Sequence, residues 1–338
     1  MSGSSLSQFL AYFDVVVQYL ENYKSLFWAI GATFIFQIFS GLINGIYARL
    51  LRPGKSLVKL GKWAVVTGAT DGIGKAMADE MARKGLSLLI ISRTKEKLSE
   101  TEKEITSKYP KIEVRTLDVD YSKFDEIQRT RVGVELEKCA VDGGISVLVN
   151  NVGISYPFTR YFHELDNDTV AKLMSMNVDA TTWMTRLALP HMLEKKKGCI
   201  VNISSAAGVS TSPLLAQYGA AKSYVAMFSR ALNYELREKG VHVQCQVPMF
   251  VATKLAKIKK TSTFVASPEA YAKAAVASIG YEVLVSPYWS HALQIWVLTS
   301  LPEFLIAWIV RDYIHKPIMK AGMKKEAREE ASAKEKSN

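Results

Sequence analysis

The chain has 338 residues, of which 49% are hydrophobic, enough for one large α/β domain with additional segments at its ends. Its formal net charge of +11 fits an anionic membrane surface or an anionic ligand; we find no nucleic-acid-binding motif and predict no nucleic-acid partner. Three cysteines without CxxC spacing argue against a disulfide framework, and five scattered histidines lead us to predict no metal site.

Residues 26–48 form the first predicted element, an uncharged run of 23 residues. As a helix it would reach about 34 Å, enough to cross a hydrocarbon core of about 30 Å, so we predict a transmembrane helix. The alternative is a buried core helix. The preceding segment 1–25 is apolar enough to lie at the membrane interface, and the linker 49–61 is basic. Because positive residues favour the cytosolic side, we expect everything after residue 48 to face the cytosol.

From residue 62 onward, short β-branched or aliphatic runs alternate with segments long enough for helices. This alternation predicts an α/β fold with a Rossmann-type, doubly wound parallel sheet that binds its ligand at the carboxyl ends of the strands. We assign the catalytic domain to residues 62–285. The predicted strands are Trp63–Thr67, Leu86–Ser92, Ile112–Leu117, Ile145–Asn150, Cys199–Ser204 and Val241–Val247.

The stretch 286–310 is apolar and rich in tryptophan, but Pro302 and Glu303 interrupt it. Since a carboxylate in the middle of a spanning helix is costly, we predict an apolar segment lying in the membrane interface, or a hydrophobic lid over a substrate tunnel. Residues 311–338 are predicted to form a charged, solvated tail in the cytosol. Lysines at the third and fifth positions from its end resemble a dilysine signal for retrieval to the endoplasmic reticulum.

A glycine-rich turn with the sequence TGATDGIG follows the first predicted strand and opens a helix. Its glycines permit a tight turn and let the backbone approach a pyrophosphate at the helix N-terminus, so the turn predicts a dinucleotide site. The alternative is a glycine-rich connection without a ligand. The residues of this turn that we expect to contact the cofactor are Gly68, Thr70, Asp71, Gly72, Ile73 and Gly74.

The second strand ends at Arg93, where an acidic residue would favour NADH, and Lys75 follows the glycine turn. Two cations at the adenosine ribose would attract a 2′-phosphate, so we predict NADPH as the cofactor, with unrelated surface charges as the alternative. Asp118, at the end of the third strand, is placed to contact the adenine. Asn151, in the motif NNVG, is expected beside the cofactor.

Tyr218 and Lys222 lie four residues apart, on one face of a predicted helix. A tyrosine with a pKa of about 10 is a poor acid near neutral pH unless a nearby cation lowers that pKa, and Lys222 can do this while holding a cofactor ribose. Ser205 can donate a hydrogen bond to a substrate oxygen, and Asn177 can anchor a water that links Lys222 to solvent. These four residues form the predicted catalytic group.

In motif order and spacing, residues 62–285 resemble the short-chain dehydrogenase/reductase superfamily. Within it, TGATDGIGKA, NNVGISYP, NISSAAG, YGAAK and the stretch 248–256 are similar to the microsomal very-long-chain 3-oxoacyl-CoA reductases. That group includes the 17β-hydroxysteroid dehydrogenases of types 3 and 12. The resemblance implies that Val251 and Thr253 also contact the cofactor.

The resemblance implies NADPH-dependent reduction of a 3-oxoacyl-CoA to a 3-hydroxyacyl-CoA, in fatty-acid elongation at the endoplasmic reticulum membrane. It also implies partners: a condensing enzyme, a dehydratase, an enoyl reductase, membrane lipid and a second copy of the chain. The alternatives are a 17β-hydroxysteroid or retinoid oxidoreductase with the same chemistry, and a catalytically idle scaffold. Val152 and Met249 replace an alanine and a glycine common in the superfamily, without touching the predicted catalytic group.

Overall fold

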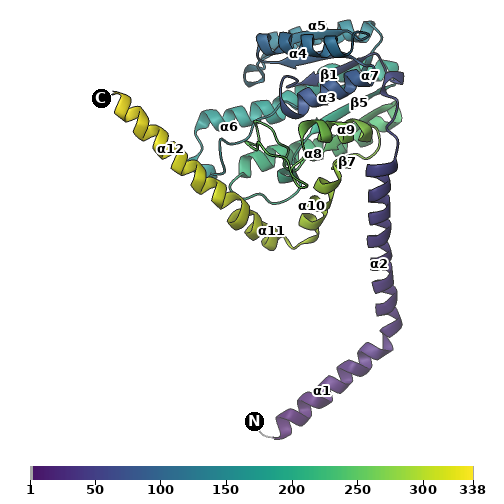
Figure 1. Ribbon diagram of the computed structural model, residues 1–338. Coiled ribbons are helices and arrows are strands. Elements are labelled where there is room, and N and C mark those ends of the chain that lie inside the picture. The colour runs from purple at the N-terminus through teal and green to yellow at the C-terminus, as the bar shows by residue number, and fades with distance from the viewer. Residues whose placement is uncertain (1–2, 338) are drawn as a thin grey trace. The chain divides into compact units, whose positions relative to one another are not determined.

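The computed structural model describes residues 3–337, in two compact units that divide between Arg52 and Pro53. The first unit consists of α1 (Gly3–Asn22), α2 (Lys24–Ile46) and a π-helical turn (Tyr47–Leu51) (Figure 1). Within the described residues, Lys24–Arg49 is the one helix that is long and apolar enough to cross a membrane, judged by length and composition. Its large apolar side chains are exposed within this unit, whereas those of a core helix are buried.

The second unit is built on a seven-stranded parallel sheet with the strand order β3-β2-β1-β4-β5-β6-β7. The strands are β1 (Trp63–Thr67), β2 (Ser87–Ser92), β3 (Val114–Asp118), β4 (Ile145–Asn150), β5 (Gly198–Ile203), β6 (Val241–Gln246) and β7 (Leu284–Val285). The order reverses between β1 and β4. Ligands of such sheets bind at the carboxyl ends of the strands beside the reversal, so the loops after β1 and β4 mark the site.

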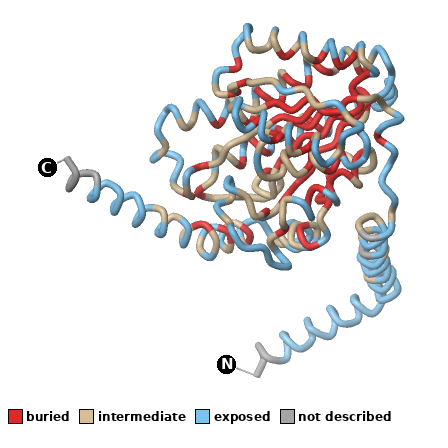
Figure 2. Tube along the Cα trace, turned by 45° about the horizontal axis from the view of Figure 1, so that its top comes forward, coloured by how far each residue is buried: buried red, intermediate tan, exposed pale blue. Residues whose placement is uncertain are grey.

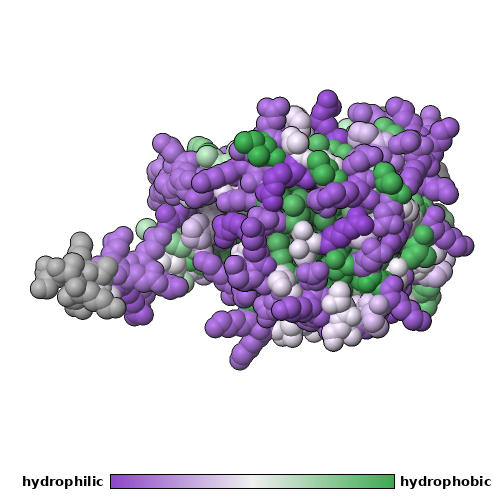
Figure 3. Space-filling model, turned by 90° about the horizontal axis from the view of Figure 1, so that it is seen from above, coloured by the Kyte–Doolittle hydropathy of each residue, from purple (hydrophilic) through white to green (hydrophobic). Residues whose placement is uncertain are grey.

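Two buried clusters cover the two faces of this sheet, because successive strand side chains point in opposite directions. Ala64 and Val66 of β1 pack with α3, α4 and α9, whereas Trp63 and Val65 pack with α5, α7 and α8. The helices are α3 (Gly72–Arg83), α4 (Lys95–Lys108), α5 (Glu126–Val141), α6 (Asn167–Met174), α7 (Ala180–Lys195), α8 (Ala216–Leu236) and α9 (Pro268–Ser278). Figure 2 shows the strands as the buried centre, and Figure 3 shows the outer face over α4 and α5 as mostly hydrophilic.

The Rossmann-like α/β sheet predicted from the sequence is confirmed, and each predicted strand overlaps an observed one. The largest difference is at β3, which begins at Val114 instead of Ile112. β7 has no predicted counterpart, because its two residues, Leu284 and Val285, are too few to produce a recognisable hydrophobic pattern.

The second half of the basic linker packs on the catalytic unit. The Tyr281 hydroxyl donates a hydrogen bond to the carbonyl of Pro53 at 2.7 Å. The Lys55 ammonium donates to the carbonyl of Gly280 and lies 4.6 Å from the centre of the Tyr281 ring. The compact unit therefore begins at Pro53, ahead of the glycine turn and its strand.

Three helices follow β7: α10 (Trp289–Ser300), α11 (Glu303–Ile309) and α12 (Lys316–Ser337), with a π-helical turn (Val310–His315) between the last two (Figure 1). Pro302 separates α10 from α11, because proline has no N–H to donate to the preceding helix. The apolar stretch 286–310 is thus broken into two short helices, neither of which is long enough to span a bilayer.

The segment predicted as a solvated tail from residue 311 onward is helical, and the first part of α12 contacts the catalytic unit, whereas residues 323–332 are exposed. Arg160 donates to both carboxylate oxygens of Glu326, at 2.8 and 2.7 Å. Gly322 lies so close to Phe158 that a Cβ at this position would come within 2.2 Å of the ring. The helix is therefore tied to the loop after β4 at Gly322 and Glu326, while its charged side chains remain exposed. The side chains of residues 333–338, including the predicted retrieval lysines, lie outside the described ones.

Candidate active site

The glycine turn after β1 has the geometry of a phosphate cradle. Gly68 and Gly72 have φ angles of +64° and +53°, in the left-handed region that favours glycine. A Cβ on Gly74 would come within 2.3 Å of the Gly68 carbonyl oxygen, so the turn closes onto α3 only with glycine there. The Asn151 amide, in the loop after β4, donates to the carbonyls of Thr67 and Gly68 at 3.0 and 3.2 Å. Asn151 therefore shapes the turn.

The N-terminus of α3 faces the loop after β6. Asp71 caps the helix by accepting a hydrogen bond from the Gly72 N–H at 2.8 Å, and it pairs with Lys254 at 2.9 Å. The Thr253 methyl group lies 3.1 Å from where a Gly72 Cβ would be. The Thr70 hydroxyl shares a hydrogen bond of 2.8 Å with Ser92 at the end of β2. Backbone N–H groups and small side chains thus surround the turn, which fits a dinucleotide pyrophosphate.

The corner expected to hold the adenosine ribose differs from the prediction in one respect. Arg93 is exposed there, as expected. Lys75, however, donates to Glu104 on α4 at 2.6 Å, so its charge is already paired. Asp118 pairs with Arg131 at 3.0 Å, which fixes its carboxylate at the end of β3. Of the two cations in the NADPH prediction, only Arg93 is left without an ion-pair partner among the described residues.

Tyr218 and Lys222 share one face of α8, with the Lys222 Nζ atom 5.9 Å from the centre of the Tyr218 ring. Lys222 is buried and donates to the carbonyl of Ile203, at the end of β5, at 3.0 Å. Burial lowers the pKa of Lys222 to about 8. Burial raises the pKa of Tyr218, whereas a hydrogen bond with the Ser205 side chain acts in the opposite direction. The phenol is therefore a protonated donor at neutral pH.

Ser205 lies two residues beyond β5, in extended backbone that begins a short 3₁₀ turn, Ala206–Gly208. Its hydroxyl accepts a long hydrogen bond from the Ala207 N–H, at 3.3 Å. Ser205 and Tyr218 line the same cavity at this sheet edge, and the Ser205 side chain is close enough to lower the pKa of the phenol. Two adjacent O–H donors of this kind can hold one carbonyl oxygen between them.

Asn177 is fully buried in a π-helical turn, Ser175–Asp179, between α6 and α7. Its amide donates to the carbonyls of Ile154 and Leu173, at 2.9 and 3.0 Å. The remaining oxygen, Oδ1, has no hydrogen-bond partner within the described chain. A Cβ on Gly153 would come within 2.5 Å of this oxygen and 3.2 Å of Lys222 Nζ, so both atoms face the same space. A buried acceptor and donor left in this way are suited to a bridging water.

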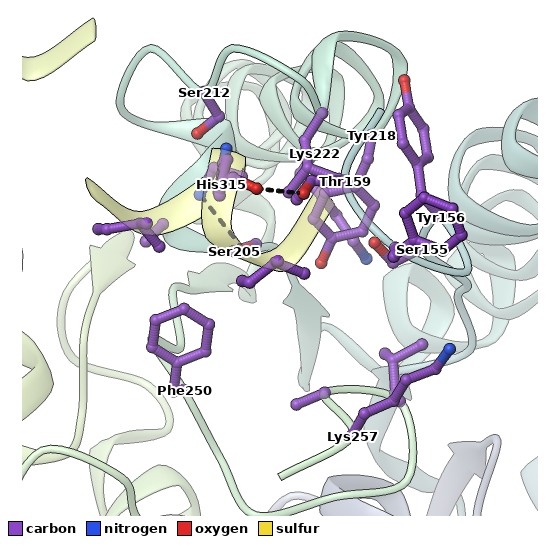
Figure 4. Close-up of a pocket in the computed structure, with 18 of the residues that line it drawn as sticks. Ser155, Tyr156, Thr159, Ser205, Ser212, Tyr218, Lys222, Phe250, Lys257 and His315 are labelled. Carbon is purple, nitrogen blue, oxygen red and sulfur yellow. Dashed lines mark hydrogen bonds between the residues drawn. The ribbon is translucent and has the colours of Figure 1, made fainter. Parts of the chain in front are cut away.

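These side chains open into a cavity of about 670 Å³ (Figure 4). The predicted residues Ile73, Asn151, Asn177, Ser205, Tyr218, Lys222, Val251 and Thr253 all line it. Asp71 and Gly72 line an adjoining cavity with Thr253. The predicted cofactor residues that lie outside both linings are Gly68, Thr70, Gly74, Arg93 and Asp118. The structure therefore brings the predicted catalytic group together with the predicted cofactor residues Ile73, Asn151, Val251 and Thr253. The other predicted cofactor residues lie outside this cavity.

His291, on α10, positions a loop of the site and has no counterpart in the sequence predictions. It is fully buried, and its Nδ1 accepts a hydrogen bond from the Met249 N–H at 3.3 Å. Its Nε2 therefore carries the proton, and donates to the carbonyl of Phe250 at 3.1 Å. Burial lowers the pKa of His291 to about 4, so the ring stays neutral. His291 thus holds the backbone of the cavity-lining loop after β6 at Met249 and Phe250. A lone histidine in an apolar stretch gives no signal of this in the sequence.

Residues 62–263 match the family model described as short chain dehydrogenase. The chain is 40% identical over 314 residues to very-long-chain 3-oxoacyl-CoA reductase-B of Danio rerio, covering 90% of this chain and 96% of that protein. It is 42% identical over 259 residues to the very-long-chain 3-oxoacyl-CoA reductase of Homo sapiens, covering 75% and 80%. A solved short-chain dehydrogenase from Sphingobium yanoikuyae in complex with NADPH has a TM-score of 0.61 at 26% identity, covering 72% of this chain and 95% of that one.

Proposed function

The chain belongs to the short-chain dehydrogenase family, and on this basis we propose that it reduces the 3-keto group of long-chain 3-oxoacyl-CoA substrates. It is an oxidoreductase that uses a nicotinamide cofactor. One observation carries the proposal: Tyr218, Ser205 and Lys222 converge on a cavity that the C-terminal helices cover with aliphatic side chains. Such a cavity offers a proton donor to a ketone and apolar surface to a lipid.

Each catalytic side chain has a separate task at the ketone. A bound, reduced nicotinamide supplies the hydride to the carbonyl carbon. Ser205 and Tyr218 hold the carbonyl oxygen, and the Tyr218 hydroxyl donates its proton to that oxygen as negative charge develops. Lys222, whose ammonium lies one turn away, stabilises the resulting phenolate. Asn177 Oδ1, next to Lys222 Nζ at Gly153, anchors the water through which Tyr218 regains a proton.

The preferred cofactor is NADPH. Arg93 stands at the end of β2 where an acidic side chain would repel a 2′-phosphate, and its exposed guanidinium can bind that phosphate through two hydrogen bonds. Asp118, held by Arg131, lies at the end of the neighbouring strand and is positioned for the adenine. Lys75 takes no part in this selection, because Glu104 neutralises it.

The protein is held at the endoplasmic reticulum membrane, with its catalytic unit in the cytosol. The helix over Lys24–Arg49 is the anchor, and the basic residues that follow it favour the cytosolic side. Exposed apolar side chains on α10 and α11, among them Trp296, Phe304 and Trp308, rest in the lipid interface. A condensing enzyme, a dehydratase and an enoyl reductase would supply its substrate and consume its product, and two copies of the chain would associate.

The test is an NADPH-oxidation assay on membranes that contain the full chain, comparing 3-oxoacyl-CoAs of several lengths with a 17-ketosteroid. We expect kcat/KM to be highest for the long 3-oxoacyl-CoAs, because only these combine a ketone with an alkyl chain long enough to contact the aliphatic lining of the cavity. A higher kcat/KM for the 17-ketosteroid would contradict the proposed substrate and leave the reductase chemistry in place. If neither the 3-oxoacyl-CoAs nor the 17-ketosteroid supported NADPH oxidation, the assignment of a ketone as the substrate would be contradicted.

A further inference from the structure

One face of the C-terminal helices forms the roof of the catalytic cavity (Figure 4). Its residues recur every three or four positions, as residues on one side of a helix do. Those that decide its character are Val310, Ile314, Ile318, Gly322, Lys325 and Glu329. From the first to the last of them, the helix extends about 28 Å. The cavity is therefore lined along the length of this helical face, which we call the stripe.

The polarity of this stripe changes along its length. Val310, Ile314 and Ile318 present only alkyl groups to the cavity, and Leu298 of α10 adds another. Beyond Gly322 the lining becomes charged, with Lys325, Glu326 and Glu329. An alkyl chain lying at the charged end would displace water from ionised groups, whereas at the other end it removes apolar surface from water.

The roof is fastened at the start of this stripe to both loops that flank the catalytic residues. The Thr159 hydroxyl, in the loop after β4, donates to the carbonyl of His315 at 2.6 Å. His315 is buried, and its Nδ1 donates to the carbonyl of Pro213, in the loop before α8. The Thr211 hydroxyl, in the same loop, donates to Glu303 of α11 at 2.8 Å. The apolar part of the stripe is therefore held over Ser205 and Tyr218.

We propose that the stripe from Val310 to Ile318, with Leu298, is the binding site for the alkyl chain of the substrate. The chain runs from the ketone at Tyr218 toward Val310, away from the charged residues at 325–329. This assignment rests on the proposed 3-oxoacyl substrate and adds where its hydrocarbon part lies. It makes the C-terminal helices part of the substrate site, and predicts that they discriminate substrates by chain length.

The test compares Ile314→Trp with Met323→Trp in the full chain, using 3-oxobutanoyl-CoA and 3-oxohexadecanoyl-CoA. Met323 lies on the same helical segment, is 50% exposed and lies outside the cavity lining, so it is the matched control. We expect Ile314→Trp to lower kcat/KM for the long substrate about tenfold relative to the short one, because an indole fills the path of the alkyl chain. Met323→Trp leaves the ratio of the two values unchanged.

A second variant, Ile314→Ala, tests the same site with a smaller side chain in case Ile314→Trp does not fold. It should raise KM for the long substrate alone by about threefold, because apolar contact with the alkyl chain is lost. Equal losses on both substrates in the two Ile314 variants would overturn the alkyl site and leave only a structural role for the roof. A wild-type protein that reduces a 17-ketosteroid but neither 3-oxoacyl-CoA would instead overturn the proposed function, and the alkyl site with it.

Discussion

The ammonium nitrogen of Lys222 lies 5.9 Å from the centre of the Tyr218 ring, one helical turn away on α8. Lys222 is buried and Tyr218 is partly buried, and burial moves their pKa values in opposite directions, upward for the phenol and downward for the ammonium. The phenol keeps its proton until a substrate oxygen takes it, and the neighbouring cation then stabilises the phenolate. The expected lowering of the Tyr218 pKa by Lys222 is not seen, because burial outweighs it. The arrangement supplies a protonated donor and a cation beside the phenolate that it would leave, and four predictions depend on it or on its surroundings.

Replacing Tyr218 with phenylalanine removes the proton donor and preserves the ring. We expect Tyr218→Phe to lower kcat for ketone reduction by about a thousandfold, in the range of a lost general acid. NADPH binding, measured by cofactor fluorescence, should stay within about twofold, because the glycine turn and Arg93 are unaltered. Unchanged activity in this variant would contradict the assignment of Tyr218 as the proton donor.

The charge of Lys222 should determine the alkaline side of the pH profile. With a pKa of about 8, Lys222 is charged below that pH and loses its charge as the pH rises through it. We therefore expect kcat/KM for reduction to decline above about pH 8. In Lys222→Arg the decline should move to higher pH, because a guanidinium stays charged. A decline at the same pH in a folded Lys222→Arg protein would assign it to another group.

Cofactor preference should depend on Arg93 and not on Lys75. Arg93→Asp removes a phosphate ligand and adds a repelling charge, so we expect the ratio of kcat/KM for NADPH over NADH to fall at least roughly tenfold. Lys75→Gln is the matched control, because Glu104 already neutralises Lys75. An unchanged ratio in Arg93→Asp, or an equal change in Lys75→Gln, would contradict the claim that Arg93, and not Lys75, selects NADPH.

His291 should act on the reaction through the loop that it holds. His291→Phe keeps a ring and removes both hydrogen bonds, to Met249 and Phe250, so we expect kcat/KM to fall roughly tenfold through displacement of the cavity wall. His291→Gln retains one donor and one acceptor and should recover part of this loss. His242→Phe, at a histidine of β6 outside the cavity lining, controls for loss of a histidine. Equal effects of the Phe and Gln changes would reduce His291 to a packing role.

The features that could be predicted from the sequence are those encoded by neighbouring residues. The glycine turn needs only Gly68 and Gly72, whose φ angles are positive, and Gly74, where a Cβ would collide with the Gly68 carbonyl. The pairing of Tyr218 with Lys222 follows from the period of one helix. The sheet was equally accessible, because both of its faces are buried and its strands are continuous apolar runs.

The features that could not be predicted depend on partners distant in the chain. Lys75 is neutralised by Glu104, 29 residues later, which no local pattern reveals. Glu326 pairs with Arg160, 166 residues away in the sequence, so the charged segment predicted as a free tail is tied to the loop after β4. His291 is recognisable only when its two backbone partners, Met249 and Phe250, are known.

The most direct test of the central claim follows the hydride and the proton donor in one product. The full chain, in membranes, is supplied with 3-oxohexadecanoyl-CoA and NADPH that carries deuterium at the transferred position of nicotinamide C4, and the product is analysed by mass spectrometry. We predict 3-hydroxyhexadecanoyl-CoA with deuterium at C3, formed by the wild-type protein and not by Tyr218→Phe. Recovery of the 3-oxoacyl-CoA unchanged by the wild-type protein, or an equal yield of labelled product from Tyr218→Phe, would contradict the account.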